Sequence, residues 1–555
     1  MDVYVSLGIA PLLLTIASFA LPLLSLIIGD RKWFYHVYAL VFSLVALFYA
    51  VINFYLVNYV HDGKPLVYPF GGWPGPIGIV YEIDGLGSVL GLLVAFDMLL
   101  VVIYSWWYMW KEEGVEWYYT LLLLLETGML GIVYTGDIFN LFVMIELLAI
   151  AAYGLVAFYR SKREAVEAAV KYSVIGATAT TMYFLAIVFI YGTYGTVNMA
   201  DLALKARPWV CSTSNIVCSF LSTVSGTGYG NTFIATAIAI ALALWAFTFK
   251  AAVFPNHFWL PDAHPEAPTP VSAALSGLVV KMGAYATIRF MYTLFGPGTV
   301  LDLHVGAISL RDVILFVLLI LGAVSAILGA LVMVIQDDIK RLLAYSTIAH
   351  LGIIFMGIGV GLRNVGESIA ALALTGVVLH IINHSFGKTL LFMASGVYIH
   401  AANSRNITSM RGLGKLLPLT TLTLIIGLLH LLGVPPLGGF FSKLLIYNAL
   451  MNSGLVVFAI ILVLSTAISI LGYMRLIVSL VIPPRPVELM EKAKEHPLAT
   501  SVLLVLAVLI VLIGITSLLG GIDYLEGLVG DTVKMKGVME YIYSMVKTST
   551  TLFKG

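Results

Sequence analysis

Charged residues and cysteines are both scarce in this sequence, and each shortage narrows what the protein can be. Lysine, arginine, aspartate and glutamate make up 11% of the 555 residues, and hydrophobic residues make up 60%. An ordinary soluble domain is about one quarter charged. The formal net charge is +1, which argues against a broad surface for binding nucleic acid. The composition therefore predicts a polytopic membrane protein.

The chain has two cysteines, Cys211 and Cys218, and both lie in one polar segment. Two thiols cannot supply a four-cysteine iron–sulfur or zinc site. The sequence also lacks a CxxCH haem motif and a phosphate-binding glycine loop between a strand and a helix. We therefore expect no cofactor in this chain, and any electron transfer must take place in other proteins.

Apolar segments long enough to span a bilayer recur along the chain and predict an all-α fold of about fourteen transmembrane helices. They lie near 5–29, 33–60, 84–108, 117–135, 137–158, 167–192, 232–253, 268–295, 311–335, 340–361, 368–399, 418–450, 456–482 and 498–520. No basic residue precedes the first segment, so we expect a retained helix rather than a cleaved signal peptide. After the last segment, Val533–Phe553 is predicted to form an amphipathic surface helix.

Two of these segments are interrupted, and each interruption lies beside a buried lysine. Pro255 follows Lys250, and the glycine- and proline-rich run 433–439 precedes Lys443. Broken helices at corresponding positions of two halves are typical of transporters built from inverted repeats. We therefore predict two inverted repeats, each with a broken helix. The predicted divisions are 1–116 (helices 1–3), 117–295 (first repeat, helices 4–8), 296–482 (second repeat, helices 9–13) and 483–555 (last helix and an amphipathic tail).

The distribution of basic residues predicts the orientation in the membrane. Connections after odd-numbered helices hold most of the lysines and arginines, among them Arg160, Lys162 and Lys340, and should therefore be cytoplasmic. Both termini are then outside, and so is the segment that holds Cys211 and Cys218. A disulfide would persist in an oxidising external compartment, and two unpaired thiols are the equally open alternative.

Ionisable residues inside apolar segments are costly, and they indicate function by default. They are Asp97, Glu126, Asp137, Glu146, Lys171, Lys250, Lys281, His350, His380, His384, Lys388 and Lys443. Asp137 and Lys171 lie near helix ends, where solvation also explains them. Glu146 lies near the middle of its segment, where a carboxylate stays charged only with a partner such as a lysine of another helix. We therefore predict a hydrated internal site that gains and loses protons, as ion translocation requires.

The run HIINHSFGK places His380, His384 and Lys388 four residues apart, on one face of a helix. Histidine titrates near neutrality and lysine does so when desolvated, so this stripe suits a proton relay. One alternative is a zinc site, although the glutamate of HExxH and a third ligand are missing. The other is a purely structural role in bonding helices together. Several unlike groups in successive segments favour the relay.

Five stretches resemble the antiporter-like subunits of respiratory NADH–quinone oxidoreductase and their relatives in multisubunit sodium/proton antiporters and membrane-bound hydrogenases. They are GDIFNLFVMIELL, FKAAVFPNHFWLPDAHPEAPTPVSAALSGLVVKMGAYATIRF, KRLLAYSTIAHLG, HIINHSFGKTLLFMASG and GVPPLGGFFSK. The first is most similar to the D-type antiporter subunit and its hydrogenase counterparts. The hydrophilic insertion 193–231 departs from the family pattern. About 35 residues after the last segment are too few for the long lateral helix of the largest such subunit, at 1.5 Å per residue.

The resemblance implies a role for each buried ionisable group. Glu146 and Lys250 would be the paired groups of a first half-channel, and Lys443 would end a second one. The connection between them would run through Lys281, His350, His384 and Lys388. The residues themselves, rather than the resemblance, add His380 of the helix stripe and the carboxylates Glu126 and Asp137 as further pathway residues. No catalytic, cofactor-binding or metal-ligating residue is expected.

These features predict a proton-translocating subunit of a membrane-bound respiratory complex, of the hydrogenase type or linked to NADH or ferredoxin, in the plasma membrane of a prokaryote. The chain would be a non-redox part of an oxidoreductase. Expected partners are the lipid bilayer, further antiporter-like and small membrane subunits, and a peripheral arm with iron–sulfur or nickel–iron centres, but no nucleic acid. One alternative is a D-type subunit of a Na+/H+ antiporter without redox chemistry, where Na+ is also a candidate ion. A structural membrane scaffold is another, and the lysines at both helix breaks speak against it.

Overall fold

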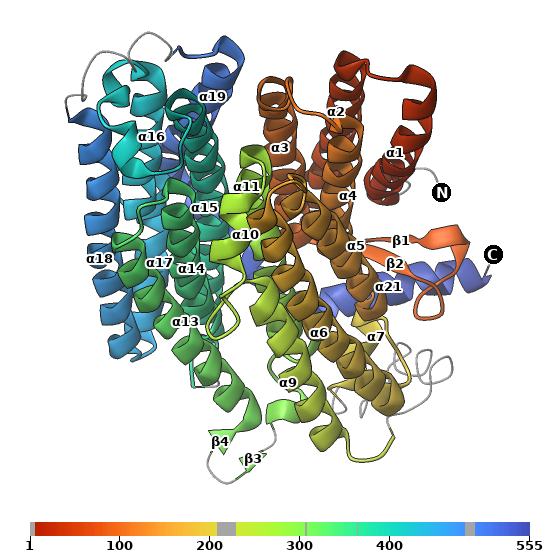
Figure 1. The fold of residues 1–555 in the computed structure, drawn as a ribbon. Helices are drawn as coiled ribbons and strands as arrows, with labels where there is room; N and C mark the ends of the chain where they lie inside the picture. The colour runs from red at the N-terminus through yellow and green to blue at the C-terminus, as the bar shows by residue number, and fades with distance from the viewer. Residues whose placement is uncertain are drawn as a thin grey trace.

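The computed structural model describes residues 6–207, 229–302, 304–305, 308–362, 364–482 and 494–554. Cys211 and Cys218 lie outside these ranges. The described chain is a bundle of long helices (Figure 1), and 13 of them are long and apolar enough to cross a membrane. The predicted all-α polytopic fold is thereby confirmed. The predicted segment 418–450 adds two shorter helices, because the chain is broken in its middle.

The first part of the chain contains α1 (Ser6–Ile28), α2 (Lys32–Tyr55), α3 (Gly85–Tyr108), α4 (Val115–Tyr134), α5 (Ile138–Val156), α6 (Arg163–Tyr194), α7 (Met199–Lys205), α9 (Thr232–Lys250), α10 (Leu260–Glu266), α11 (Thr269–Ala274) and α12 (Val280–Ile288). The second part contains α13 (Leu310–Val334), α14 (Ile339–Ile358), α15 (Glu367–Ala402), α16 (Pro418–Leu432), α17 (Gly438–Asn452), α18 (Val456–Val481), α19 (Pro497–Thr516), α20 (Ile522–Val529) and α21 (Met535–Lys554). Two short antiparallel hairpins, β1 (Leu66–Pro69) with β2 (Val80–Ile83) and β3 (His304–Val305) with β4 (Ile308–Ser309), complete the fold.

Short polar side chains fix where several helices begin. Asp84 accepts a hydrogen bond from the backbone N–H of Gly87 at the start of α3, and Asp338 accepts two at the start of α14. Backbone N–H groups in the first turn of a helix have no partner within the helix, so a carboxylate at this position satisfies them. The boundaries of the apolar segments are therefore set by single capping residues.

The break after Lys250 leads into a short helix, α10. The chain leaves α9 at Lys250 and re-enters a helix at Leu260, and α10 packs against α6 and α14. The next membrane span, Thr269–Leu294, is buried throughout and contains π-helical turns at Leu275–Val279 and Arg289–Leu294. Such turns recur at functional sites because they widen the helix and free a carbonyl group.

The predicted amphipathic helix is present as α21, which in Figure 1 lies across the steep helices of the bundle. Val538, Tyr541, Ile542 and Met545 on one of its faces are buried, and the helix contacts α7 and β1. The part of the chain before it is helical rather than an irregular polar tail, since α19 continues through a π-helical turn into α20.

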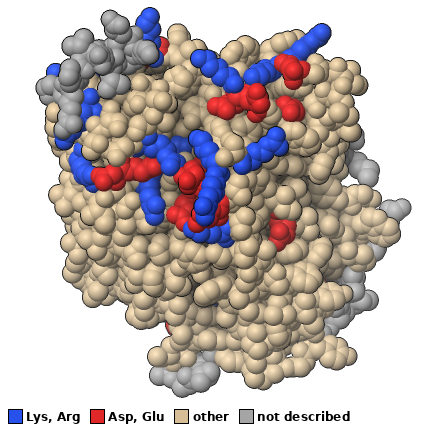
Figure 2. Space-filling view, viewed as in Figure 1, with Lys and Arg blue, Asp and Glu red and all other residues tan. Residues whose placement is uncertain are grey.

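Charged side chains are unevenly distributed over the surface. On the face shown in Figure 2 they gather in the upper half, and the lower half is almost free of them. Large hydrophobic side chains such as Leu26, Ile27 and Val457 are exposed on α1 and α18. An extensive exposed apolar surface of this kind is typical of a protein that contacts lipid.

Candidate functional site

Titratable side chains from four elements lie in the interior of the bundle. They are Lys281 of α12, His350 of α14, His380, His384 and Lys388 of α15, and Lys443 of α17, and none is more than 8% exposed. The structure therefore brings together all the predicted residues of the central connection and the second half-channel, although they come from four separate segments of the sequence.

Three histidines form the centre of this group. The Nδ1 atom of His350 lies 3.1 Å from Nε2 of His380, and the ring of His384 lies 4.9 Å from that of His350. The Nδ1 atom of His380 also lies 2.9 Å from Oγ of Ser442 on α17. Neither ring nitrogen of His384 has a hydrogen-bond partner within the described chain. A proton can therefore pass directly between His350 and His380, whereas His384 needs a bridging water.

The lysines of the centre are held by backbone carbonyls and hydroxyls rather than by carboxylates. Lys388 donates to the carbonyl of Leu343 at 3.0 Å and to Oγ of Ser346 at 2.5 Å. Lys281 donates to the carbonyl of Ser276, within the π-helical turn that precedes it. Such neutral acceptors solvate an ammonium group without forming an ion pair with it, so both lysines are suited to exchanging a proton.

Lys443 lies at the break between α16 and α17. Gly433 ends α16 with a φ of 84°, in the left-handed region that favours glycine, and leaves the last carbonyls of that helix without helical partners. The Nζ atom of Lys443 lies 2.7 Å from the carbonyl of Leu431 and 3.3 Å from that of Leu432. The ammonium group therefore turns back into the break and replaces the hydrogen bonds that the helix has lost.

Glu146 and Lys250, the predicted pair of the first half-channel, do not form an ion pair with each other within the described chain. Lys250 is the last residue of α9, and its ammonium group has no hydrogen-bond partner among the described residues. It lies 5.9 Å from the ring centre of Tyr172. Glu146 is half-buried on α5 and close enough to act electrostatically on Lys250, yet no ion pair links these two described residues. In this structure the pair is open.

Glu126 and Asp137 lie apart from the central group. Glu126 of α4 accepts a hydrogen bond of 2.8 Å from Ser43 of α2. Asp137 caps α5 and accepts hydrogen bonds from the backbone N–H groups of Phe139 and Asn140, at 2.8 and 2.7 Å. Burial raises the pKa of Asp137 to about 6. Within the described chain, neither carboxylate is bonded to the lysines or histidines of the central group. Asp137 caps helix α5, and Glu126 links α4 to α2.

Sequence reasoning missed two buried groups beside the central lysines. His264 of α10 is fully buried, and both of its ring nitrogens lack partners within the described chain. Burial, with Lys281, Lys388 and Lys340 nearby, holds the pKa of His264 well below its usual range. Lys340 was expected only as a basic residue of a cytoplasmic loop, but its Nζ atom is buried, 2.7 Å from the carbonyl of Ala267. The run DAHPEAPTP, which is polar between apolar segments, was the available clue.

A charged cavity of about 250 Å3 opens beside these two groups. Glu164, Lys171, Asp262, Glu266, Asp338, Arg341 and Arg405 are among its lining residues. Lys171 is half exposed, near the start of α6, and its Nζ atom forms an ion pair of 2.8 Å with Glu167.

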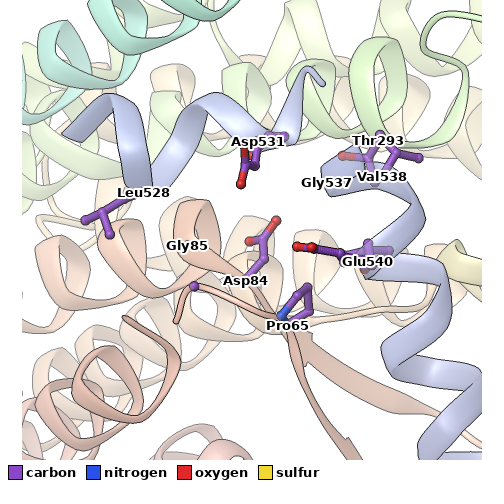
Figure 3. A pocket seen from close by; sticks show the side chains of 12 residues that line it. Pro65, Asp84, Gly85, Thr293, Leu528, Asp531, Gly537, Val538 and Glu540 are labelled. Carbon is purple, nitrogen blue, oxygen red and sulfur yellow. The ribbon is translucent and has the colours of Figure 1, made fainter. Parts of the chain in front are cut away.

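A second ionic site lies at the far end of the Thr269–Leu294 span. Arg289 forms two hydrogen bonds of 2.6 Å to the carboxylate of Asp84, although 205 residues separate them in the sequence. Its Nε atom also donates to the hydroxyl of Tyr285 at 2.9 Å. Figure 3 shows Asp84, Asp531 and Glu540 directed toward one another around a small pocket at this point. Arg289 lies within the predicted segment 268–295, but the sequence analysis missed it among the ionisable residues of the apolar segments.

Comparison with known proteins identifies the family of this chain. A family model described as "NADH:quinone oxidoreductase/Mrp antiporter, TM" matches residues 135–469, which include the whole central group. The chain belongs to this family. It is 34% identical over 419 residues to NADH-quinone oxidoreductase subunit N of Desulforudis audaxviator, covering 75% of each chain. The resemblance inferred from the five sequence stretches is thereby confirmed.

Two further comparisons mark the range of the family. The chain is 29% identical over 415 residues to the D-type subunit of the Na(+)/H(+) antiporter of Alkalihalophilus pseudofirmus, covering 74% of this chain and 75% of that one. Among solved structures, a chain of the membrane-bound sulfane sulfur reductase (MBS), an archaeal respiratory membrane complex, superposes with a TM-score of 0.83 at 29% identity. That superposition covers 98% of this chain and 100% of the other, so this family member shares its complete fold with that subunit.

Proposed function

We propose that this antiporter-like chain is the proton-translocating subunit of a membrane-bound respiratory complex. Protons move along the buried Glu, Lys and His residues, from the Glu146–Lys250 side to Lys443, and partner subunits supply the driving force. The observation that carries the proposal is the contact of His350 with His380 in a group that also contains Lys281, Lys388 and Lys443. Buried cations packed this closely are costly unless protons can leave and return.

The geometry supports a separate task for each part of the proposed pathway. The three histidines exchange protons over hydrogen-bond distances, directly or through one water. Lys388 and Lys443 accept a proton when the neighbouring group is neutral and release it when that group becomes charged, because like charges in a dry interior repel strongly. Lys250 has no fixed partner among the described residues, so closing and opening of its pair with Glu146 can gate the first half-channel.

The complex is proposed to lie in the plasma membrane of a prokaryote, with both termini outside. Its further membrane subunits and a peripheral redox arm with iron–sulfur or nickel–iron centres are part of the same proposal. The comparison with a respiratory membrane complex over nearly the whole chain supports this assignment. The second candidate function is ion exchange in a Na+/H+ antiporter without redox chemistry, which the similarity to a D-type antiporter protein favours.

Purification of the native complex through a tag on this chain separates the two candidates. Iron–sulfur or nickel–iron proteins among the co-purifying subunits would support the respiratory complex, and small membrane subunits alone would support the antiporter. Proton movement itself is tested with the complete complex in vesicles that contain a pH-sensitive dye. We expect a pH change during turnover that is lost in Lys388→Ala although the complex assembles. Unchanged proton transport in that variant would contradict the proposed function.

A further inference from the structure

Asp97 is a buried carboxylate that belongs to neither predicted half-channel, and it lies near Lys281. Asp97 is on α3, and its side chain is completely buried. Its Oδ2 atom accepts a hydrogen bond of 2.6 Å from the hydroxyl of Thr389, the residue after Lys388 on α15. Its Oδ1 atom has no hydrogen-bond partner among the described residues. A buried carboxylate with one free oxygen is expensive unless a positive charge compensates for it.

Asp97 and Lys281 approach the same peptide, Ser276–Gly277, although no ion pair links these two described residues. The ammonium group of Lys281 donates to the carbonyl of Ser276, and a Cβ atom on Gly277 would lie 3.1 Å from Oδ2 of Asp97. The same Cβ would lie 2.5 Å from the hydroxyl of Thr389. The lack of a side chain at Gly277 is thus what lets Asp97 approach the π-helical turn that also holds Lys281.

The other titratable groups around Lys281 are basic. They are His264 of α10, His350 of α14, and His380, His384 and Lys388 of α15. Among the acidic groups of the described chain, Asp97 approaches the peptide that holds Lys281, whereas Glu126 is hydrogen-bonded to Ser43 of α2. Without it, a proton on Lys281 would have only basic neighbours.

We propose that Asp97 is the counter-charge of Lys281 and therefore a further functional residue of the proton pathway. The pair lets Lys281 hold a proton between the open Glu146–Lys250 pair and the histidines. The hydrogen bond from Thr389 stabilises the carboxylate when Lys281 has passed its proton on. This inference rests on the proposed function, because a counter-charge matters for transport only if Lys281 carries protons.

The test removes the negative charge of Asp97 while keeping the size of its side chain. Asp97→Asn is compared with the conservative Asp97→Glu and with Ser105→Ala, a matched control on α3. Within the described chain, the hydroxyl of Ser105 bonds to Val101 and Tyr118. Proton transport by the complete complex in vesicles is measured over a range of pH. In Asp97→Asn we expect the alkaline limb of the profile to move to lower pH by roughly one unit or more, because Lys281 loses the charge that helps it keep its proton. Asp97→Glu and Ser105→Ala should keep the original profile.

If the Asp97→Asn variant does not assemble, a second measurement, the assembly of a double variant, tests the inference. If the two residues are paired, Asp97→Asn combined with Lys281→Gln should assemble better than either single variant, since no buried charge is left alone. A wild-type pH profile in assembled Asp97→Asn, or a double variant that assembles no better than both single ones, would overturn the inference. If Lys388→Ala stops transport while Asp97→Asn keeps its profile, the inference fails alone. If Lys388→Ala transports normally, the proposed function fails.

Discussion

At the scale of single residues, the four buried lysines of the pathway differ in what holds them. Lys443 donates to two carbonyls and to the hydroxyl of Thr466, and Lys388 donates to one carbonyl and one hydroxyl. Lys281 donates to one carbonyl, and Lys250 has no hydrogen-bond partner within the described chain. The number of fixed acceptors therefore falls from the second half-channel to the first, and Lys250 depends most on water and on Glu146.

The partners of Lys443 predict that arginine cannot replace it. We expect Lys443→Arg to lose proton transport almost as completely as Lys443→Ala, because a guanidinium group keeps its proton. A lysine that only anchored the helix end at the membrane surface would tolerate arginine, but this ammonium group turns inward to Leu431 and Leu432. Transport rates of the two variants in assembled complexes decide the point. A rate near wild type for Lys443→Arg would reject the gating role.

The open state of the Glu146–Lys250 pair leads to a second expectation. Glu146→Gln and Lys250→Ala should each abolish coupled transport and leave assembly intact. Breaking a closed buried ion pair costs about 3–5 kcal/mol. Since this pair is open here, the loss of thermal stability should be clearly smaller than that. Transport and melting temperature of each variant are the measurements, and full transport in either one would refute the pairing.

At the scale of elements, the period of α15 places His380, His384 and Lys388 on one buried face, as the proposed relay requires. His380 is held by His350 and Ser442, whereas Lys388 connects α15 to α14 and, through Ser346, to Tyr473 of α18. The stripe thus links the helices of the second half to one another.

Single substitutions along this stripe should lower the transport rate to different extents. We expect His380→Ala and His384→Ala to retain part of the transport rate, because a water can bridge one missing ring. Lys388→Ala should lower it much further, since no neighbouring side chain of the described chain takes over its two hydrogen bonds. The three rates, measured in complexes of equal subunit content, give the order. Normal transport in Lys388→Ala together with a loss in His380→Ala would reverse it.

The π-helical turn at Leu275–Val279 contains Gly277, whose substitution tests how tightly this turn is packed. Gly277→Ala would place a methyl group 2.5 Å from the hydroxyl of Thr389, so we expect a loss of about 1–3 kcal/mol of stability from overpacking. Gly192→Ala on α6 is the matched control, because nothing lies within 4 Å of its added carbon. There the higher helix propensity of alanine should stabilise by up to about 1 kcal/mol. Thermal unfolding of the two variants should therefore shift in opposite directions, and equal shifts would contradict this packing.

At the scale of the whole molecule, sequence patterns predicted the features that short stretches of sequence determine, namely the helices and their breaks. Segment lengths gave the number of spans, and the run 433–439 gave the second break. They could not show that Lys340 is buried, because beside Arg341 it resembles an ordinary cytoplasmic basic residue, and only the packing of α10 against α14 encloses it. The partner of Arg289 was equally hidden, since Asp84 is 205 residues away.

The predicted orientation can be checked with the two cysteines. If connections after odd-numbered helices are cytoplasmic, Cys211 and Cys218 should react with an impermeant thiol reagent added outside, after reduction of any disulfide. Mass spectrometry of intact cells and of inverted vesicles measures the labelled fraction. Labelling from the cytoplasmic side alone would reverse the orientation, and with it the direction of proton movement.

The position of α21 has a consequence for how the protein is made. Tyr541 of this helix lies 5.7 Å from the guanidinium group of Arg289, and Glu540 and Asp531 stand around the same pocket as Asp84. This end of the central span is therefore closed by a segment that follows every membrane-spanning helix of the described chain. Because α21 is synthesised after these helices, we expect the Asp84–Arg289 pair to stay open to water in a partly synthesised chain until α21 docks.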